Sequence, residues 1–141
     1  MLMNDNPKKP VDGTPTTEST DEVAGPTASN EDLARAAVDE TSEHLGSDIV
    51  LLDTRGISSF ADFFVIVSGE TDRHIESMAD DISRRVRAMG VHITHREGSG
   101  RGGWVLLDFT GFVVHLFTRE QRVRYGLEQL WSRATEIVRV Q

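Results

Sequence analysis

The chain has no cysteine and no long apolar run among its 141 residues. The absence of cysteine excludes disulfides, thiolate metal sites and cysteine nucleophiles, and it fits a reducing compartment. No stretch approaches the roughly 20 apolar residues that a membrane helix needs, and residues 1–10 lack the apolar centre of a signal peptide. We therefore expect a cytoplasmic protein.

Basic residues are outnumbered by acidic ones. The chain has 15 Lys and Arg against 23 Asp and Glu, which gives a formal net charge of −8. Nucleic-acid binding draws most of its free energy from Lys and Arg placed against phosphates. The charge balance therefore argues against broad nucleic-acid binding and favours a basic protein surface as the partner.

Proline is confined to the start of the chain. All four prolines lie within the first 26 residues, among Thr, Ser, Asp, Glu and Gly and with few large apolar side chains. Such a segment cannot bury enough surface to offset its chain entropy. We expect residues 1–29 to form a disordered tail and residues 30–141 to form one compact α/β domain.

Hydrophobic periodicity predicts three helices and five strands in this domain. Ser29 or Asn30 can cap the first helix, Asp72 can cap the second, and a third begins near Thr118. The strands are predicted at Asp48–Asp53, Phe63–Val67, Val91–Glu97, Trp104–Phe109 and Phe112–Phe117. This order indicates a mixed five-stranded sheet with flanking helices.

The most informative segment joins a turn, a strand and a polar strand end. Gly56 and Ser58 are typical turn residues, residues 63–67 form an apolar run typical of a strand buried on both faces, and Ser68 ends it. Three later segments are equally specific: Trp104-Val-Leu-Leu-Asp108-Phe, Val113-Val-His115 and Tyr125-Gly-Leu-Glu-Gln-Leu-Trp131. Together they resemble the ribosomal silencing factor family (RsfS, also called Iojap), over roughly residues 32–131.

This resemblance implies a fold like that of nucleotidyltransferases, without their activity and without a cofactor. It implies that the protein binds ribosomal protein uL14 on the large ribosomal subunit, at the face that meets the small subunit. The bound protein would then block subunit joining sterically and repress translation when nutrients are short. The resemblance also implies a homodimer, which nothing in the periodicity of this chain indicates.

One sheet segment carries the candidate contact residues. Trp104 begins a strand directly after a glycine-rich loop, and tryptophan often anchors interfaces, although packing in the core explains it equally well. With the resemblance, the candidate partner-binding residues are Trp104, Leu106, Asp108, Phe109, His115 and Tyr125. Alternation places the first three on one strand face and Phe109 on the other, and we favour the face that ends in the acid. A buried, hydrogen-bonded sheet residue is the competing interpretation of His115.

The last predicted helix has an apolar side and a basic cluster. Leu127, Leu130 and Trp131 recur at helical spacing and are expected in the core, with Glu128 pointing outward. The arginines 119, 122 and 124 are expected either to be solvated or to touch ribosomal RNA at the edge of a docked complex.

Catalytic chemistry is poorly supported. A divergent Mg²⁺-dependent nucleotidyltransferase, the alternative function, needs two carboxylates one residue apart on a strand, and the chain offers only Asp53, Asp62 and Asp108 at separate strand ends. The loop of residues 98–103 precedes a strand rather than a helix, so we interpret it as a connector and not a phosphate site. His92 and His95 are three apart on a predicted strand, which argues against a shared zinc ion.

Overall fold

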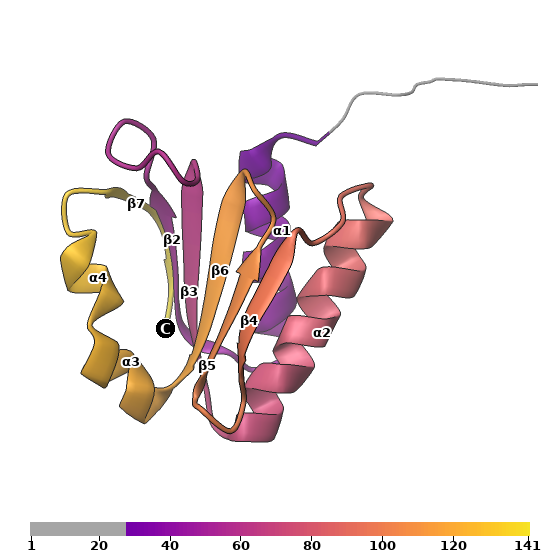
Figure 1. Cartoon of the computed structure of the whole chain (residues 1–141), viewed down its shortest axis with the longest axis vertical. Coiled ribbons are helices and arrows are strands. Elements are labelled where there is room, and N and C mark those ends of the chain that lie inside the picture. The colour runs from indigo at the N-terminus through magenta and orange to yellow at the C-terminus, as the bar shows by residue number, and fades with distance from the viewer. Residues whose placement is uncertain (1–27) are drawn as a thin grey trace, which may run out of the picture.

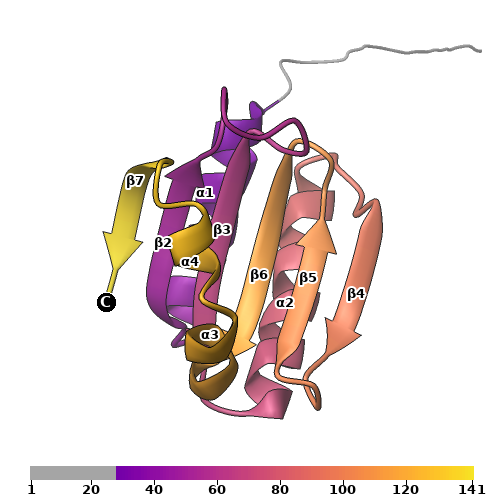
Figure 2. The same cartoon turned by 60° about the vertical axis from the view of Figure 1, so that its left-hand side comes forward.

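The computed structural model describes residues 28–141, which form a six-stranded mixed sheet with helices on both faces (Figures 1 and 2). The helices are α1 (Asn30–Glu43), α2 (Asp72–Ala88), α3 (Arg119–Tyr125) and α4 (Leu127–Leu130). The strands are β2 (Ser47–Asp53), β3 (Phe63–Gly69), β4 (His95–Ser99), β5 (Trp104–Asp108), β6 (Phe112–Thr118) and β7 (Thr135–Val140). The predicted tail lies outside the described residues except for its last two positions. The predicted α/β fold with a mixed sheet is confirmed.

The sheet is built around β3, whose seven residues are all buried. The strand order is β4-β5-β6-β3-β2-β7, and only the pair of β3 and β6 is parallel. A parallel neighbour requires a crossover, and the chain supplies it through α2, β4 and β5 before it returns along β6. The apolar run of residues 63–67 is therefore a strand with neighbours on both sides and side chains buried on both faces, as its sequence predicted.

Helices α1 and α2 cover one face of the sheet (Figure 1). In α2, the buried side chains are Ile75, Met78, Ala79, Ile82 and Val86. They recur at helical spacing and pack with residues of α1 and the strands in the larger of two apolar clusters. This amphipathic pattern in the sequence predicted the helix correctly.

The N-terminal ends of both long helices are capped by hydroxyl side chains. Ser29 accepts a hydrogen bond from the backbone N–H of Asp32, and the Asp32 carboxylate accepts one from the backbone N–H of Ser29. This reciprocal capping box confirms one of the two predicted caps of α1. At α2 the prediction was one residue off, because Thr71, not Asp72, accepts from the backbone N–H of His74.

His74 ties the start of α2 to the end of α1. Its Nδ1 accepts a hydrogen bond from the backbone N–H of Glu70 at 2.9 Å. In the neutral ring the proton must then reside on Nε2, which donates to the carbonyl oxygen of His44 at 2.7 Å. The last carbonyl groups of a helix have no hydrogen-bond donor within the helix. The imidazole of His74 supplies a donor for one of them at the C-terminal end of α1.

The edge strand β4 begins later than predicted. Val91 and Ile93 pack against the larger core cluster before the strand starts, and pairing with β5 runs only from His95 to Ser99. Consequently His92, which was predicted to lie in this strand, precedes it in the structure. Gly98 and Ser99, predicted as loop, form the last two pairs of the ladder.

The C-terminal region differs most from the prediction of a single helix. Gly126 adopts a left-handed conformation with φ 57°, ends α3 and precedes the short helix α4. The chain then forms β7, which pairs antiparallel with β2 and gives the sheet a sixth strand that the sequence analysis missed. No helix within residues 28–141 is long and apolar enough to cross a membrane.

Candidate functional site

The second face of the sheet is only partly covered. Helices α3 and α4 lie over the β2 and β3 side of this face and leave β5 and β4 uncovered (Figure 2). Along β5, Trp104, Leu106 and Asp108 are half-buried on the uncovered face, whereas Val105 and Leu107 are fully buried in the core under α2. The alternation predicted from the sequence is therefore confirmed for this strand.

Trp104 lies within a layer of aromatic rings on this face. Its ring centroid lies 5.3 Å from that of Phe117 and 4.6 Å from that of Tyr125. Further along the sheet, the rings of Phe64 and Trp131 meet edge to face at 5.0 Å. Such pairs contribute beyond their buried area, so the layer holds Trp104 in place while part of its ring stays accessible.

His115 lies beneath Trp104 and is 5% exposed. The indole N–H of Trp104 donates to Nδ1 of His115 at 3.2 Å. The indole nitrogen can only donate, so Nδ1 of His115 must be unprotonated and accept this hydrogen bond. The proton of the neutral imidazole therefore resides on Nε2. Burial lowers the pKa of His115 to about 4, in agreement with a neutral ring at physiological pH. Nε2 itself is buried without a hydrogen-bond partner among the described residues.

Tyr125 and Asp108 border the same surface. Tyr125 ends α3 and is 48% exposed, which leaves its ring partly free beside Trp104. Asp108 ends β5, and its Oδ1 accepts the backbone N–H of Thr110 at 2.8 Å. We call the surface formed by Trp104, Leu106, Asp108 and Tyr125 over His115 the open sheet face.

Phe109 does not belong to this surface. It is 4% exposed and stacks on Phe112 at a centroid distance of 4.7 Å within the core cluster under α1 and α2. A partner could reach it only by opening that core. Of the six predicted contact residues, the structure places four at the open sheet face, buries His115 beneath them and places Phe109 on the opposite side.

The sequence analysis missed two residues of the same face, His95 and Glu97 on β4. Cross-strand pairing places His95 opposite Asp108 and Glu97 opposite Leu106, so the side chains of each pair share a face. His95 Nε2 lies 2.6 Å from Glu97 Oε2. Both lay within the predicted strand Val91–Glu97, but only pairing with β5 shows which face of the sheet they share.

The predicted basic cluster does not form one surface. Arg122 is 8% exposed, and its guanidinium donates to both carboxylate oxygens of Glu128 and to the Ser68 hydroxyl. It also bonds the carbonyl of Asp48. Hydrogen bonding to Arg122 lowers the pKa of Glu128 despite partial burial. Arg122 is therefore a structural residue, and Glu128 does not point freely outward as predicted.

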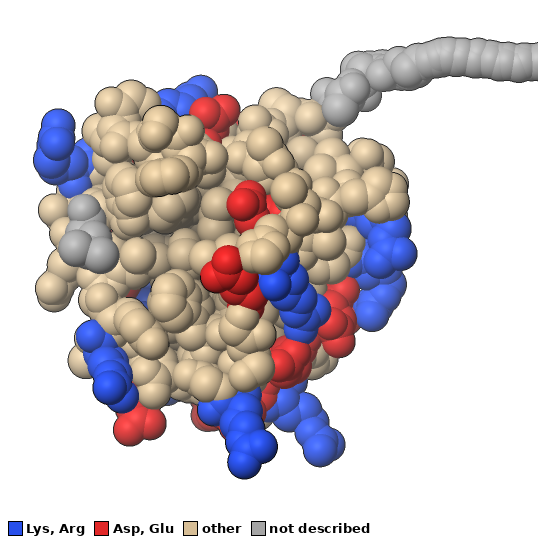
Figure 3. Space-filling model, viewed as in Figure 1, with Lys and Arg blue, Asp and Glu red and all other residues tan. Residues whose placement is uncertain are grey.

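The other two arginines of that cluster stay at the surface. Arg119 pairs with Glu70 at 3.0 Å, and Arg124 is exposed. In Figure 3, charged side chains of both signs lie along the lower and right-hand margins, acidic side chains also lie near the middle, and basic side chains project at the upper left.

The three carboxylates considered for nucleotidyl transfer do not form one cluster among residues 28–141. Asp53 pairs with Arg55 at 2.6 Å, and hydrogen bonding to that side chain lowers the Asp53 pKa. Asp62 accepts from the side chain of Asn30 instead. Strand β6 lies between Asp62, which precedes β3, and Asp108 on β5, and β3 lies further between Asp53 on β2 and that strand. Within residues 28–141 these acids form no group that could hold a metal ion.

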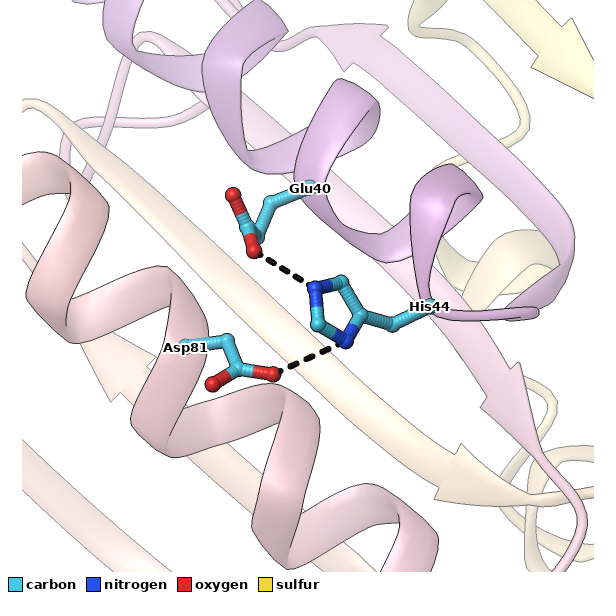
Figure 4. Close-up of side chains that lie close together, drawn as sticks. All are labelled: Glu40, His44 and Asp81. Atoms are coloured by element: carbon cyan, nitrogen blue, oxygen red, sulfur yellow. Dashed lines mark ion pairs between the residues drawn. The ribbon is translucent and has the colours of Figure 1, made fainter.

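One group of potential metal ligands does occur between α1 and α2. His44 Nε2 lies 2.9 Å from Glu40, and His44 Nδ1 lies 3.0 Å from Asp81 (Figure 4). The two carboxylates thus contact opposite nitrogens of the His44 ring, rather than converging with one nitrogen on a position that a metal ion could occupy. Arg85 also pairs with Glu40, and Arg84 with Asp81. This arrangement is typical of an ion-pair network that joins two helices.

The glycine-rich loop serves as a tight connector. Its residues 100–103 turn between β4 and β5, and the Gly103 backbone N–H donates to the carbonyl of Gly100. The Gly100 backbone N–H donates to the Glu76 carboxylate at 2.6 Å. The Gly100 N–H that a bound phosphate would need is therefore already hydrogen-bonded to a carboxylate of α2. This favours the interpretation of the loop as a connector over a phosphate site.

Comparison with known proteins identifies related sequences. Residues 27–141 match the family model RsfS, described as ribosomal silencing factor during starvation. The ribosomal silencing factor RsfS of Halalkalibacterium halodurans is 33% identical over 109 residues, which cover 77% of this chain and 93% of that protein. The RsfS of Bacillus subtilis is 36% identical over 102 residues, covering 72% and 84%. The chloroplastic protein Iojap of Zea mays is 35% identical, covering 74% of this chain and 44% of that protein.

Solved structures share the fold as well. A crystal structure of a Chromobacterium violaceum protein aligns with a TM-score of 0.72 at 28% identity, covering 74% of this chain and 88% of that one. A crystal structure of a Bacillus halodurans protein aligns with a TM-score of 0.67 at 30% identity, covering 77% and 98%.

Proposed function

The chain belongs to the ribosomal silencing factor family, and from this premise we propose that it binds the large ribosomal subunit and represses translation. Several relatives are named as silencing factors, and one from mouse is named for mitochondrial assembly of the large ribosomal subunit. In this proposal the protein acts in the cytoplasm and does so by binding, without making or breaking a bond.

The partner we propose is ribosomal protein uL14, and the contact surface is the open sheet face. The observation that carries this assignment is the half-buried indole ring of Trp104 beside the half-exposed Tyr125. Aromatic residues held rigidly at a surface lose little entropy on binding and often dominate interface energetics. Asp108 at the end of β5 adds a negative charge suited to a basic protein.

Repression follows from competition for one surface. A protein bound at the large-subunit face that meets the small subunit excludes the small subunit by its bulk. The factor need only occupy that face more tightly than the small subunit does under the prevailing conditions, which is mass action. The net charge of −8 would speed the encounter with a basic ribosomal protein.

Nucleotidyl transfer is not favoured, because Asp53, Asp62 and Asp108 form no group that could hold a metal ion within residues 28–141. A thermal-shift titration with nucleoside triphosphates and Mg²⁺ tests it directly. A ligand that binds only the folded state raises the melting temperature as its concentration rises. A saturable increase would revive the enzyme hypothesis, and we expect none.

Co-sedimentation with purified large subunits tests the proposed surface. Leu106→Asp places a charge in the middle of the open sheet face, and we expect it to lower large-subunit affinity by at least about tenfold. Val123→Asp is the matched control, since Val123 is 84% exposed on α3. Equal binding by both variants and the wild type would reject the open sheet face as the contact surface.

A further inference from the structure

A small hollow lies on the open sheet face between β4 and β5. It has a volume of about 90 Å³ and is lined by Glu97, Gly98, Trp104 and Leu106. Glu97 pairs across the strands with Leu106, so its carboxylate rises on the same face as the indole of Trp104. The hollow thus combines an aromatic wall, an aliphatic wall and a carboxylate.

Gly98 holds β4 close to β5 at this point. Its φ is 81°, a left-handed conformation that favours glycine, and an added Cβ would lie 2.1 Å from the carbonyl oxygen of Trp104. The backbone therefore forms one wall of the hollow without a side chain that would fill it.

The carboxylate of Glu97 is accessible and incompletely paired. Its side chain is 63% exposed, and within residues 28–141 its one hydrogen-bond partner is His95, which contacts only Oε2. The neighbouring Arg96 does not neutralise it, because Arg96 pairs with Glu76 and Asp80 on α2. Oε1 of Glu97 is left free to accept from an incoming donor.

We propose that this hollow receives an arginine side chain of the protein partner, an inference that rests on the proposed function. A guanidinium is planar and weakly hydrated, so it can stack against the indole of Trp104 while its N–H groups donate to Glu97. A second acid, Asp108, lies on the same strand face and adds to the attraction of a cation.

Size and charge both favour this occupant. A volume of about 90 Å³ corresponds to about three water molecules, which suits a guanidinium head group better than a large aromatic side chain. The two carboxylates would repel a phosphate or an acidic side chain. Glu97 therefore becomes a contact residue of the proposed interface, although it lies on an edge strand outside the sequence motifs.

The test uses the full chain and a small probe. The Trp104 indole N–H resonance reports on the hollow, and the probe is N-acetyl-arginine-N-methylamide, with the uncharged citrulline analogue as control. We expect a saturable shift with arginine, at most a tenth of that shift with citrulline, and loss of the response in Glu97→Gln. Glu43→Gln, an exposed acid at the end of α1, should respond like the wild type. Equal shifts with both probes, or an unchanged response in Glu97→Gln, would overturn the proposal.

A second measurement separates this inference from the proposed function. Glu97→Lys should lower the affinity for purified large subunits by at least about tenfold, whereas Glu43→Lys should not. If the wild type binds no large subunits, the ribosomal function fails while the arginine probe still reports on the hollow. If the wild type binds and Glu97→Lys binds equally well, the hollow is not part of the interface.

Discussion

The indole N–H of Trp104 donates to Nδ1 of His115, at 3.2 Å, across the neighbouring strands β5 and β6. This hydrogen bond fixes the tautomer of a buried imidazole and the position of the ring that we place at the centre of the interface. It links the buried layer of the sheet to the surface.

His115 should make stability depend on pH. Its folded pKa is about 4, below the ordinary value of 6.5, because burial disfavours the charged ring. Between pH 6.5 and 4 the unfolded chain binds the extra proton, so the free energy of unfolding falls as pH falls through that window. The loss is on the order of 3 kcal/mol, since one pKa unit corresponds to about 1.4 kcal/mol.

Urea unfolding of the wild type and His115→Gln between pH 7 and 4.5 measures this effect. Subtracting the two profiles removes the contribution of the other titrating groups. We expect the wild type to lose more stability toward low pH than the variant. Parallel profiles would show that His115 titrates alike in the folded and unfolded chains.

Arg122 should be essential for stability rather than for binding. Replacing it by Met leaves the partly buried Glu128 without its partner and the Ser68 hydroxyl without a donor. We expect a loss of about 1.5 to 3 kcal/mol, as for hydrogen bonds to charged groups, because water can still reach the partly exposed Glu128 carboxylate. Arg124→Met, at an exposed position of the same helix, should change stability by less than about 0.5 kcal/mol. Similar melting temperatures for both variants would contradict the structural role.

Two glycines near the hollow should respond differently to alanine. Gly98→Ala should cost about 1 to 3 kcal/mol, because its φ is positive and its Cβ would collide with backbone. Gly102 has no positive φ, and its added Cβ would meet its nearest atoms at 3.7 Å. Gly102→Ala should therefore be tolerated. Chemical denaturation compares the two, and an equal cost would disprove the close approach of Gly98 to β5.

Charge reversal at Asp108 should weaken large-subunit binding. Asp108→Lys replaces an attraction for a basic partner by a repulsion, and the loss should be largest at low ionic strength, where charges are least screened. Asp80→Lys on α2 makes the same change of charge on the opposite side of the sheet. Binding measured at two salt concentrations distinguishes the variants. Unchanged affinity of Asp108→Lys would remove Asp108 from the interface.

The buried parts of this fold were predictable because their signals are local. The apolar run of β3 and the 3.6-residue periodicity of α2 each identify an element within one segment. The cap of α2 was misplaced because Thr71 and Asp72 are both good capping residues. Only the extended backbone of Thr71, with φ −139° and ψ 166°, decides between them.

The elements that were missed depend on distant contacts. β7 is a half-exposed edge strand whose identity rests on pairing with β2, far away in the sequence. Arg122 belongs to a surface-like arginine cluster, and its burial depends on Asp48 and Ser68, which lie 74 and 54 residues away. No local pattern reveals either feature.

The candidate site was predictable where alternation applied. Trp104, Leu106 and Asp108 share a face because side chains alternate along a strand, and the same rule turns Phe109 to the other side. His95 and Glu97 lay within the predicted edge strand but were missed, because their face is set by pairing with β5 rather than by a local pattern.

The most direct test of the account is subunit joining on sucrose gradients. Purified small and large subunits are mixed at a Mg²⁺ concentration that allows joining, with wild-type protein, with Leu106→Asp or with neither, and each fraction is probed for the protein. The account predicts that the wild type travels with the large subunit and lowers the joined peak, whereas Leu106→Asp does neither. A joined peak of full height, with wild-type protein absent from the large subunit or bound without effect, would contradict the proposed steric block.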